Sequence, residues 1–411
     1  MNPTIKLCRS CGSNEIHEVF DLGVQKLSGT FIDKDLDKIT EGPLTLAICK
    51  ECCLVQLKHN YPLNEMYNEG YGYRSGLTQF MREHLEKIAK QGINLAKLSK
   101  GDYILDIGSN DGTLLSSYDD SEYHLIGIDP VAKKYLDLYP KNCNVVTDFF
   151  SASQYFEITN KKAKIITSVS MFYDLEDPTS FVDSIAKVLD ENGVWIFEQS
   201  YLPAMLKRNS YDTICHEHLE YYSLESINHL INKSGLKLIS ATQNEVNGGS
   251  IRLVATHENS ELATTNSAEL SWLLEQELNH GVSSDESFER FKVEVIKSKN
   301  DLISLLKKLK AEGKKVIGYG ASTKGNVILQ YCGITAELLP FIGDITPFKD
   351  GKFTPGTNIP IISMNKAKEL NPDYFLVLPW GFRNDVLIRE MELIKNGVKF
   401  IFPLPFVEII G

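Results

Sequence analysis

The sequence has no uncharged apolar run long enough to cross a bilayer, and residues 1–6 do not open a signal peptide. It also has no excess of positive charge, since 43 Lys and Arg against 54 Asp and Glu give a formal net charge of −11. That charge opposes general attraction to nucleic acid or to an anionic membrane surface. We therefore expect a cytoplasmic protein with no nucleic-acid and no membrane partner, in which an anionic ligand needs a local basic pocket.

Short internal repeats are absent too, and the eight cysteines do not read as a disulfide framework, because no secretion signal accompanies them. Five of them lie within residues 1–53, where they include two Cys-x-x-Cys pairs. Two such pairs can place four thiolates around a tetrahedral Zn²⁺, so we predict a structural zinc site made by Cys8, Cys11, Cys49 and Cys52. Cys53 is the alternative to Cys52, and the two-residue spacing favours Cys52. Buried free cysteines or a redox dithiol are the competing interpretations.

A glycine turn follows the apolar stretch 104–107, and we expect a helix to begin behind it. Gly108 and Gly112 let the backbone pass close to a ligand, but Asn110 stands where a dinucleotide-binding fingerprint has its middle glycine. The segment resembles motif I of class I S-adenosylmethionine (SAM) methyltransferases. The cofactor-binding residues expected in this turn are Asp106, Gly108, Ser109, Asn110 and Gly112.

A second acid supports this interpretation about twenty residues later. Asp129 ends the next apolar stretch, where a carboxylate can accept hydrogen bonds from two neighbouring ribose hydroxyls. In a methyltransferase, Asp148 and Phe149 would then lie beside the adenine, and Ser170 would lie near the transferable methyl group. A Rossmann-like domain that binds another nucleoside is the alternative.

Farther along the chain, helical and strand-like patterns alternate. Residues 78–100 have a helical period, and residues 103–255 alternate as a parallel doubly wound sheet requires. Residues 258–312 are polar and helix-prone, with an apolar stripe that we expect to be a packing face: Leu302, Leu305, Leu306 and Leu309. A second α/β pattern begins at 315, and Lys324 in the first turn of its helix could hold a phosphate.

The sequence His216-Glu217-His218 invites either a metal site or acid–base chemistry. In an extended segment the two histidines would share a face and Glu217 would point away. One imidazole could remove a carbon-bound proton next to a ketone, and a charged surface loop is the alternative. Arg252, after two glycines, could contact a phosphate or sugar, or form a structural ion pair.

Taken together, the motifs resemble the NDP-sugar C-methyltransferases over nearly the full length. They are the two Cys-x-x-Cys pairs, Tyr-Gly-Tyr-Arg-Ser-Gly at 71–76, the glycine turn, Glu217-His218, residues 248–252, Gly-Tyr-Gly-Ala at 318–321, the segment 344–351 and Pro-Gly-Thr at 355–357. The resemblance implies an α/β protein in which a class I SAM methyltransferase (Rossmann-like) domain is flanked by a small N-terminal zinc module and a C-terminal Rossmann-like domain. The expected boundaries are 1–70 for the zinc module, 71–257 for the methyltransferase domain, 258–312 for a helical connection and 313–411 for the C-terminal domain.

The same resemblance implies a nucleotide-linked 4-keto deoxysugar, held between the middle and C-terminal domains, as the small-molecule substrate. His218 would remove the proton at C3 and the enolate would attack the methyl group of SAM, while Glu217 and Tyr73 orient the sugar and stabilise the oxyanion. The substrate-binding residues that it implies are Tyr71, Arg74, Asp174, Tyr222, Arg252, Lys324 and Lys349. The cofactors are SAM and structural Zn²⁺, and we expect a monomer or weak dimer.

Some positions depart from the family pattern. Asp174 stands where a histidine is usual, Cys215 where a tyrosine is usual, Lys26 where a proline is usual and Asn358 where a histidine is usual. These departures motivate two alternative functions: C-methylation of a different activated carbon acid, or a zinc-ribbon binding protein with a non-catalytic methyltransferase core.

Overall fold

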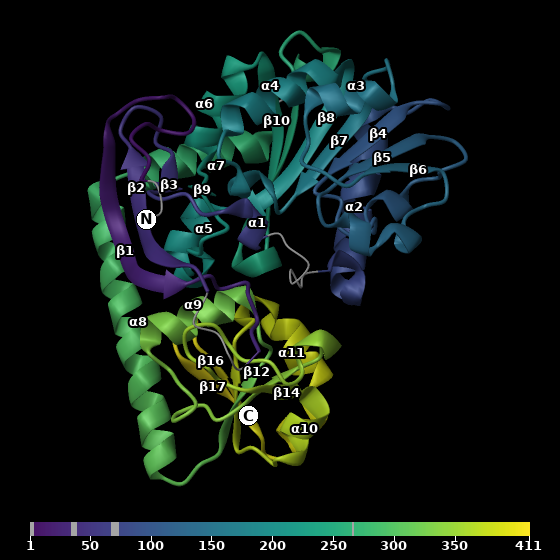
Figure 1. The fold of residues 1–411 in the computed structure, drawn as a ribbon. Coiled ribbons are helices and arrows are strands. Elements are labelled where there is room, and N and C mark those ends of the chain that lie inside the picture. The colour runs from purple at the N-terminus through teal and green to yellow at the C-terminus, as the bar shows by residue number, and fades with distance from the viewer. Residues whose placement is uncertain (1–3, 34–38, 67–73, 265–266) are drawn as a thin grey trace.

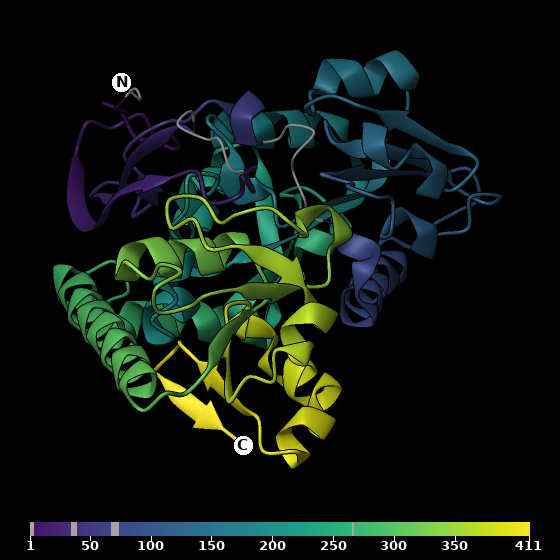
Figure 2. The same cartoon turned by 60° about the horizontal axis from the view of Figure 1, so that its bottom comes forward.

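The computed structural model describes residues 4–33, 39–66, 74–264 and 267–411. They form three sheets with helices around them, and the three parts are stacked so that the N-terminal sheet and the C-terminal α/β part both contact the middle of the chain (Figures 1 and 2). None of the helices in these ranges is both long and apolar enough to cross a membrane.

The N-terminal sheet is antiparallel and borrows its last strand from far along the chain. Its order is β1-β2-β3-β9, formed by β1 (Ile16–Lys26), β2 (Glu41–Cys49), β3 (Val55–Leu57) and β9 (Glu220–Tyr221), with the short helix α1 (Leu63–Met66) after β3. Val55 pairs with Tyr221. Because β9 begins two residues after His218, this sheet fixes the position of the His216–His218 segment.

The middle sheet has seven strands in the order β10-β11-β8-β7-β4-β5-β6. They are β4 (Tyr103–Ile107), β5 (His124–Ile128), β6 (Cys143–Val146), β7 (Ala163–Val169), β8 (Leu189–Ser200), β10 (Leu236–Asn244) and β11 (Ser250–His257). The strands β4 to β8 pair in parallel as predicted, but β11 is antiparallel to both β8 and β10. A wholly parallel sheet is therefore wrong, because residues 245–249 are too short a connection for anything except a hairpin.

Helices cover both faces of this sheet. On one face lies α2 (Gln79–Ala96), where Gly92 approaches Ile165 and Ile196 closely. Other helices of the middle region are α3 (Ala152–Ile158), α4 (Pro178–Val188), α5 (Leu202–Lys207) and α6 (Leu224–Lys233). The helix expected behind the glycine turn is absent, since a single 3₁₀ turn, η2 (Leu115–Ser117), stands there. Tyr118, with an extended φ of −106° and ψ of 152°, ends this 3₁₀ turn before an α-helix can form.

Two helices connect the middle sheet to the C-terminal sheet. They are α7 (Ala268–His280) and α8 (Asp285–Ala311), and α8 runs beside β1 down to the C-terminal part (Figure 1). The side chains of Leu302, Leu306 and Leu309 are buried and Leu305 is partly buried against the same core. The leucine stripe is therefore a packing face, as predicted.

The C-terminal sheet has the order β14-β13-β12-β15-β16-β17 and is parallel except for β17. Its elements in chain order are β12 (Val316–Tyr319), α9 (Thr323–Cys332), β13 (Ile342–Asp344), β14 (Ile361–Ser363), α10 (Met364–Glu369), β15 (Tyr374–Val377), α11 (Arg383–Arg389), α12 (Met391–Lys395), β16 (Lys399–Phe402) and β17 (Glu408–Ile410).

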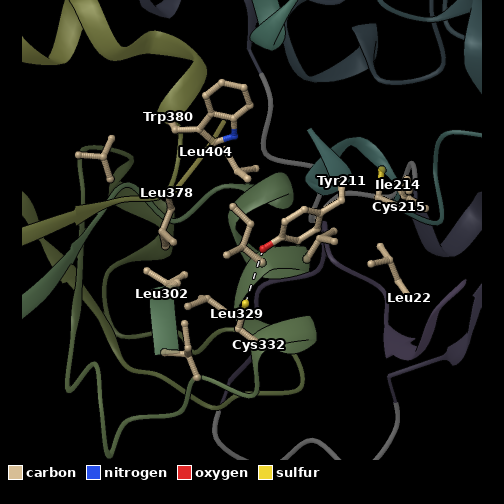
Figure 3. Packing of buried hydrophobic residues seen from close by; sticks show 14 of the residues in the cluster. Leu22, Tyr211, Ile214, Cys215, Leu302, Leu329, Cys332, Leu378, Trp380 and Leu404 are labelled. Carbon is tan, nitrogen blue, oxygen red and sulfur yellow. Dashed lines mark hydrogen bonds between the residues drawn. The ribbon is translucent and has the colours of Figure 1, made fainter. Parts of the chain in front are cut away.

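One apolar core joins the N-terminal sheet to the C-terminal sheet. It begins with Phe20 and Leu22 of β1 and extends through α8 and α9 to Leu404. Figure 3 shows Tyr211, which precedes the His216–His218 segment, packed into this core with its hydroxyl 3.6 Å from the sulfur of Cys332. Burial of this shared apolar surface holds the N-terminal and C-terminal sheets in a fixed position relative to each other.

Candidate active site

Four cysteine sulfurs meet in the N-terminal module. The sulfur atoms of Cys8, Cys11, Cys49 and Cys52 all lie within 4.8 Å of one another, with pairs at 3.6 Å (Cys8–Cys52) and 3.5 Å (Cys11–Cys49). Tetrahedral Zn–S bonds of about 2.3 Å place sulfur atoms about 3.8 Å apart, so the set fits Zn²⁺. Cys53, with a φ of 59°, turns out of the group, which confirms Cys52 as the fourth member.

A first cavity of about 190 Å³ lies at the carboxyl ends of the parallel strands β4, β5 and β7. Ligands of doubly wound sheets bind at this edge. The expected cofactor-binding residues that line it are Asp106, Gly108, Ser109, Asn110, Asp129, Asp148, Phe149 and Ser170. Gly112 supports the turn instead, because a Cβ there would lie 2.8 Å from the ring of Tyr139.

Hydrogen bonds hold the glycine turn against the next strand. The backbone N–H groups of Asn110 and Val131 donate to the two carboxylate oxygens of Asp129 at 2.9 and 2.6 Å, and Tyr139 donates its hydroxyl to the carbonyl of Asn110 at 2.9 Å. The carboxylate of Asp129 is thus held in place by the protein itself. Asp106 is buried and accepts a hydrogen bond from Thr167 at 2.6 Å, and burial raises the pKa of its carboxyl to about 7.

The segment that precedes α2 folds over this turn. Arg74 donates from Nε to Asp111 at 3.0 Å, while the N–H groups of Ser75 and Gly76 donate to Asn110 and Asp111, each at 3.0 Å. Arg74, expected to bind substrate, therefore lies beside the cofactor turn and pairs with a carboxylate that the sequence analysis did not single out. Tyr71 and Tyr73 lie outside the described residues.

A second cavity, of about 360 Å³, lies between the middle sheet and the C-terminal sheet. Glu217, His218, Asp174, Lys324 and Lys349 all line it, so the structure brings together these five predicted site residues from four separate segments. Ser170 and Asp174 line both cavities. A ligand in the first cavity and a ligand in the second can therefore meet at the end of β7.

The ring of His218 is held in one tautomer. Its Nδ1 lies 2.8 Å from the carbonyl oxygen of Thr213. Since a carbonyl can only accept, Nδ1 carries the proton and Nε2 is the basic atom of the neutral ring. Burial, followed by the positive charge of Lys324, lowers the pKa of His218 to about 3, so the ring is neutral near pH 7. Its ring also lies against Tyr173, with centroids 4.2 Å apart.

The His216–His218 segment is a turn, and this overturns the expected side-chain arrangement. The N–H of His218 donates to the carbonyl of Cys215 at 3.2 Å, which closes the turn. Glu217 and His218 consequently face the same cavity, whereas His216 packs against Tyr61, with ring centroids 4.5 Å apart. His216 and His218 do not share a face, because the segment is not extended.

Glu217 receives its neighbours from the N-terminal module. A Cβ on Gly29 would lie 2.5 Å from Oε1 of Glu217, so the backbone of that module touches the carboxylate. Burial raises the pKa of Glu217, and its Oε2 has no hydrogen-bond partner within the described part of the chain. A buried oxygen of this kind can accept a hydrogen bond from a ligand hydroxyl.

Positive groups enter the second cavity from the C-terminal sheet. Lys324 donates to the carbonyl of Asn247 at 2.7 Å and to Oγ1 of Thr213 at 3.3 Å. Lys349 donates to the carbonyl of Ala321 at 2.7 Å, and Arg389 donates to the hydroxyl of Tyr319 at 2.8 and 3.0 Å. Two buried acids, Asp212 and Asp344, line the same side, and Lys349 lies 3.7 Å from Asp344, so three cations stand here beside two carboxyl groups.

Like Arg74, two other predicted substrate-binding residues line neither cavity. Tyr222 is fully buried and its ring stacks on Phe172, with centroids 5.1 Å apart. Arg252 donates to Glu198 at 2.9 Å, and that carboxylate also contacts His84 at 2.5 Å. For Arg252 the fold therefore shows the structural ion pair, one of the two possibilities left open by the sequence. Tyr222, which follows β9, is a core residue.

Other residues of the second cavity escaped the sequence analysis. Trp380 donates its indole N–H to the buried carboxylate of Asp212 at 2.7 Å, and both residues line the cavity. Gly29 and Phe31 come from the N-terminal module, where no motif marked them. Trp380 follows three residues after β15 ends, so a search of the residues directly after each strand would have found it. Arg389 lies farther on, at the end of α11, and such a search would have missed it.

Comparisons with known families cover almost the whole chain. Residues 8–67 match a zinc binding domain, residues 75–241 match a methyltransferase domain, and residues 245–405 match a C-methyltransferase C-terminal domain. The C-methyltransferase NovU from Streptomyces niveus is 28% identical over 408 residues, which cover 98% of this chain and 96% of that protein.

Solved structures resemble the middle part. The N-methyltransferase NodS from Bradyrhizobium japonicum WM9 in complex with S-adenosyl-L-homocysteine has 13% identity and a TM-score of 0.34, covering 46% of this chain and 93% of that chain. Magnesium protoporphyrin IX methyltransferase from Synechocystis PCC 6803 with bound SAM has 12% identity and a TM-score of 0.32, covering 43% and 79% of the two chains. At these identities the likeness concerns the fold alone.

Proposed function

The chain belongs to the SAM-dependent C-methyltransferases that combine a zinc-binding domain, a methyltransferase domain and a C-terminal C-methyltransferase domain, and from this premise we propose that its acceptor is a nucleotide-linked 4-keto deoxysugar. Its cofactor is SAM, and the four-cysteine group holds a structural zinc ion. The acceptor, the methylated carbon C3 and the roles of individual residues are the content of the proposal.

The observation that carries the proposal is the position of His218. Its unprotonated Nε2 belongs to a side chain that lines the second cavity, and that cavity shares Ser170 and Asp174 with the cofactor cavity. A neutral imidazole at this place suits removal of a proton from a carbon next to a ketone, because the ketone acidifies that C–H bond. The electron pair of the broken C–H bond becomes an enolate, and the proton moves to Nε2.

Bound in the first cavity, SAM supplies an electrophilic methyl group, whose transfer to the enolate carbon leaves a neutral thioether. The protein's own contribution is alignment. Asp129 accepts hydrogen bonds from ribose hydroxyls, and Glu217 accepts one from a sugar hydroxyl through its unpartnered oxygen. Holding two reactants at one junction can supply several kcal/mol of the acceleration, on the order of 7–11 kcal/mol in the best cases.

The basic wall of the second cavity supports a nucleotide-linked acceptor. This wall consists of Lys349 and Arg389 of the C-terminal α/β part, with Asp344 beside Lys349, while His218 belongs to the segment before β9. A diphosphate held by the basic wall leaves the sugar near His218. This division of the cavity into an anionic-ligand end and a base end is what a free sugar would not need.

The test is turnover of a panel of nucleoside-diphosphate 4-keto-6-deoxyhexoses with ¹³C-methyl SAM, read by NMR. We expect a new C–CH₃ group, and solvent deuterium at C3 when S-adenosylhomocysteine replaces SAM. His218→Asn should lower both rates about 10²–10⁴-fold, the usual contribution of a general base. His280→Asn, at an exposed histidine of α7, is the matched control and should leave both rates unchanged.

A methyl group found on oxygen or nitrogen would exclude the enolate mechanism. Turnover of another carbon acid, with no 4-keto sugar accepted, would favour the second candidate acceptor, which the unusual Asp174 and Cys215 motivate. Failure to bind S-adenosylhomocysteine by calorimetry would point to a non-catalytic core.

A further inference from the structure

Lys324 is already committed to the segment that carries the base. Its ammonium group donates to the carbonyl of Asn247 at 2.7 Å and to Oγ1 of Thr213 at 3.3 Å. An ammonium group has three donors, and in the described part of the chain these two acceptors leave one, on a side chain that lines the second cavity. Both acceptors belong to the middle part of the chain, which also carries His218.

The helix around Lys324 adds positive potential at the same point. Ser322 caps α9 by accepting from the N–H of Gly325 at 3.0 Å, and the first turn of α9 contains no acidic residue. A cation at a helix N-terminus is unfavourable by about 0.3–1 kcal/mol. The nearby Asp212 offsets part of this cost, since its charge raises the pKa of Lys324, although burial lowers that pKa more strongly. The arrangement concentrates positive charge where an anion can be received.

Thr213 fixes the ammonium group relative to the base. Its carbonyl oxygen accepts from Nδ1 of His218 at 2.8 Å, and its hydroxyl oxygen accepts from Lys324. The proton acceptor and the ammonium group are therefore held by two atoms of one residue. If the carbon next to a ketone faces His218, the ketone oxygen lies two bonds from that carbon and so in the same part of the cavity.

We propose that Lys324 stabilises the enolate oxygen that forms when His218 removes the proton, and that it is not a ligand of the substrate's phosphates. This inference rests on the proposed function. A preorganised donor in a water-poor site acts most strongly where charge develops during the reaction. The phosphates are left to Lys349 and Arg389, which line the same cavity and whose polar contacts, with Ala321 and Asp344 and with Tyr319 and Asp385, lie within the C-terminal part.

One departure from the family pattern removes a donor from this cavity. Cys215 stands where a tyrosine hydroxyl is usual, and burial raises the pKa of its thiol well above the ordinary range, so it is a poor donor. An ammonium group can take over the stabilisation of an oxyanion without any proton transfer. The proton that leaves carbon goes to His218, and Lys324 keeps its own.

Charge balance gives a second signature. The positive charge of Lys324 opposes protonation of His218 in the empty site, and the enolate oxygen cancels that opposition as it forms. Around His218 the charged or titratable side chains that line the same cavity are Tyr173, Asp174, Asp212, Cys215, Glu217 and Lys324. Removing the ammonium charge should therefore raise the pKa of His218 and move the acid limb of the kcat/KM profile to higher pH.

The experiment compares Lys324→Met and Lys324→Arg with Lys366→Met, a control at an exposed lysine of α10. The readouts are kcat, exchange of the C3 proton with S-adenosylhomocysteine present, and the Kd of UDP and dTDP by calorimetry. We expect Lys324→Met to lose about 10²–10³-fold in kcat and in exchange, the scale of one oxyanion donor, with the Kd of the free nucleotides changed less than twofold. Lys324→Arg should recover part of the loss.

The inference is overturned if Lys324→Met exchanges the proton normally, or if it weakens UDP and dTDP binding tenfold while kcat is kept. Should the Met variant fail to fold, Thr213→Val tests the same contact, because it removes the hydroxyl acceptor of Lys324 and keeps the carbonyl that holds His218. It should lose part of kcat without a change in nucleotide Kd, and wild-type kcat would contradict us. Absence of exchange in the wild-type protein would refute the proposed function itself.

Discussion

Replacing Gly29 with alanine should disable the active site while leaving the fold nearly intact. The new Cβ would lie 2.5 Å from Oε1 of Glu217 and no closer than 3.7 Å to any other atom. The atom in the way is the end of a side chain, and Gly29 does not have a left-handed φ. The backbone can therefore stay where it is, and Glu217 must move.

The size of the displacement follows from ordinary contact distances. Ordinary contacts of a Cβ atom lie at 3.4–4 Å. To reach that range the carboxylate oxygen has to move by about 1 Å, and a misplacement of about that size can cost about 10²-fold in rate. Overpacking of a buried site costs about 1–3 kcal/mol when backbone moves, and we expect the low end because only a side chain yields. The prediction is kcat lowered about 10²-fold with a modest loss of unfolding free energy.

Gly23→Ala is the matched control from the same module. Its φ is +78° and a Cβ there would meet nothing within 4 Å, so the substitution strains the backbone by about 1–2 kcal/mol without touching the site. Urea unfolding and steady-state kinetics should then distinguish the two variants. Gly23→Ala should lose stability and keep kcat, whereas Gly29→Ala should lose kcat. Zinc content should stay the same in both.

A double variant decides whether Gly29 acts through Glu217. If it does, Gly29→Ala combined with Glu217→Gln should be no slower than Glu217→Gln alone, because the displaced group has already lost its role. Additive losses in the double variant, or an unchanged kcat in Gly29→Ala, would refute the reasoning.

Three further outcomes are expected. Asp129→Ala should weaken binding of S-adenosylhomocysteine in calorimetry by at least tenfold, since a charge-assisted hydrogen bond contributes about 1.5–3 kcal/mol; unchanged affinity would remove this carboxylate from the cofactor site. Cys8→Ser should lower both zinc content and thermal stability, and a normal zinc content would contradict the four-cysteine site. Burial raises the pKa of Asp106 to about 7, so the folded state keeps a proton that the unfolded chain loses near pH 4, and the ligand-free protein should lose stability as pH rises from about 4 to 7. Asp106→Asn should flatten that part of the stability profile, measured by unfolding at several pH values, and an unchanged slope would show that this carboxyl is not its source.

Local motifs were predicted well because a few adjacent residues determine their geometry. The Cys-x-x-Cys pairs could be assigned to zinc from spacing, and the glycine turn to SAM from Asn110 and Asp129. The parallel strands β4 to β8 followed from alternating patterns. The α-helix predicted after the glycine turn was wrong. Its absence depends on the extended backbone of Tyr118, which the apolar pattern of the sequence does not indicate.

The second cavity could be predicted only in part, because it depends on contacts between distant segments. Glu217 and His218 were identified, yet their shared orientation comes from a turn closed by Cys215 and from the strand β9 that follows. From the sequence, Tyr222 and Arg252 could equally bind substrate. In the fold, Tyr222 is fully buried in the core and Arg252 pairs with Glu198. The roles of all these residues, like the domain boundaries, stay predictions.

The core shared by the N-terminal sheet and the C-terminal sheet has a consequence for biosynthesis. Leu22 of β1 and Leu404, which follows β16, belong to one apolar cluster. The elements that pack on β1 from this cluster are α8 and α9, so during translation the earliest strand waits, with one face unburied, until α9 has left the ribosome. A ribosome-bound chain truncated before α9 should present that face to chaperones.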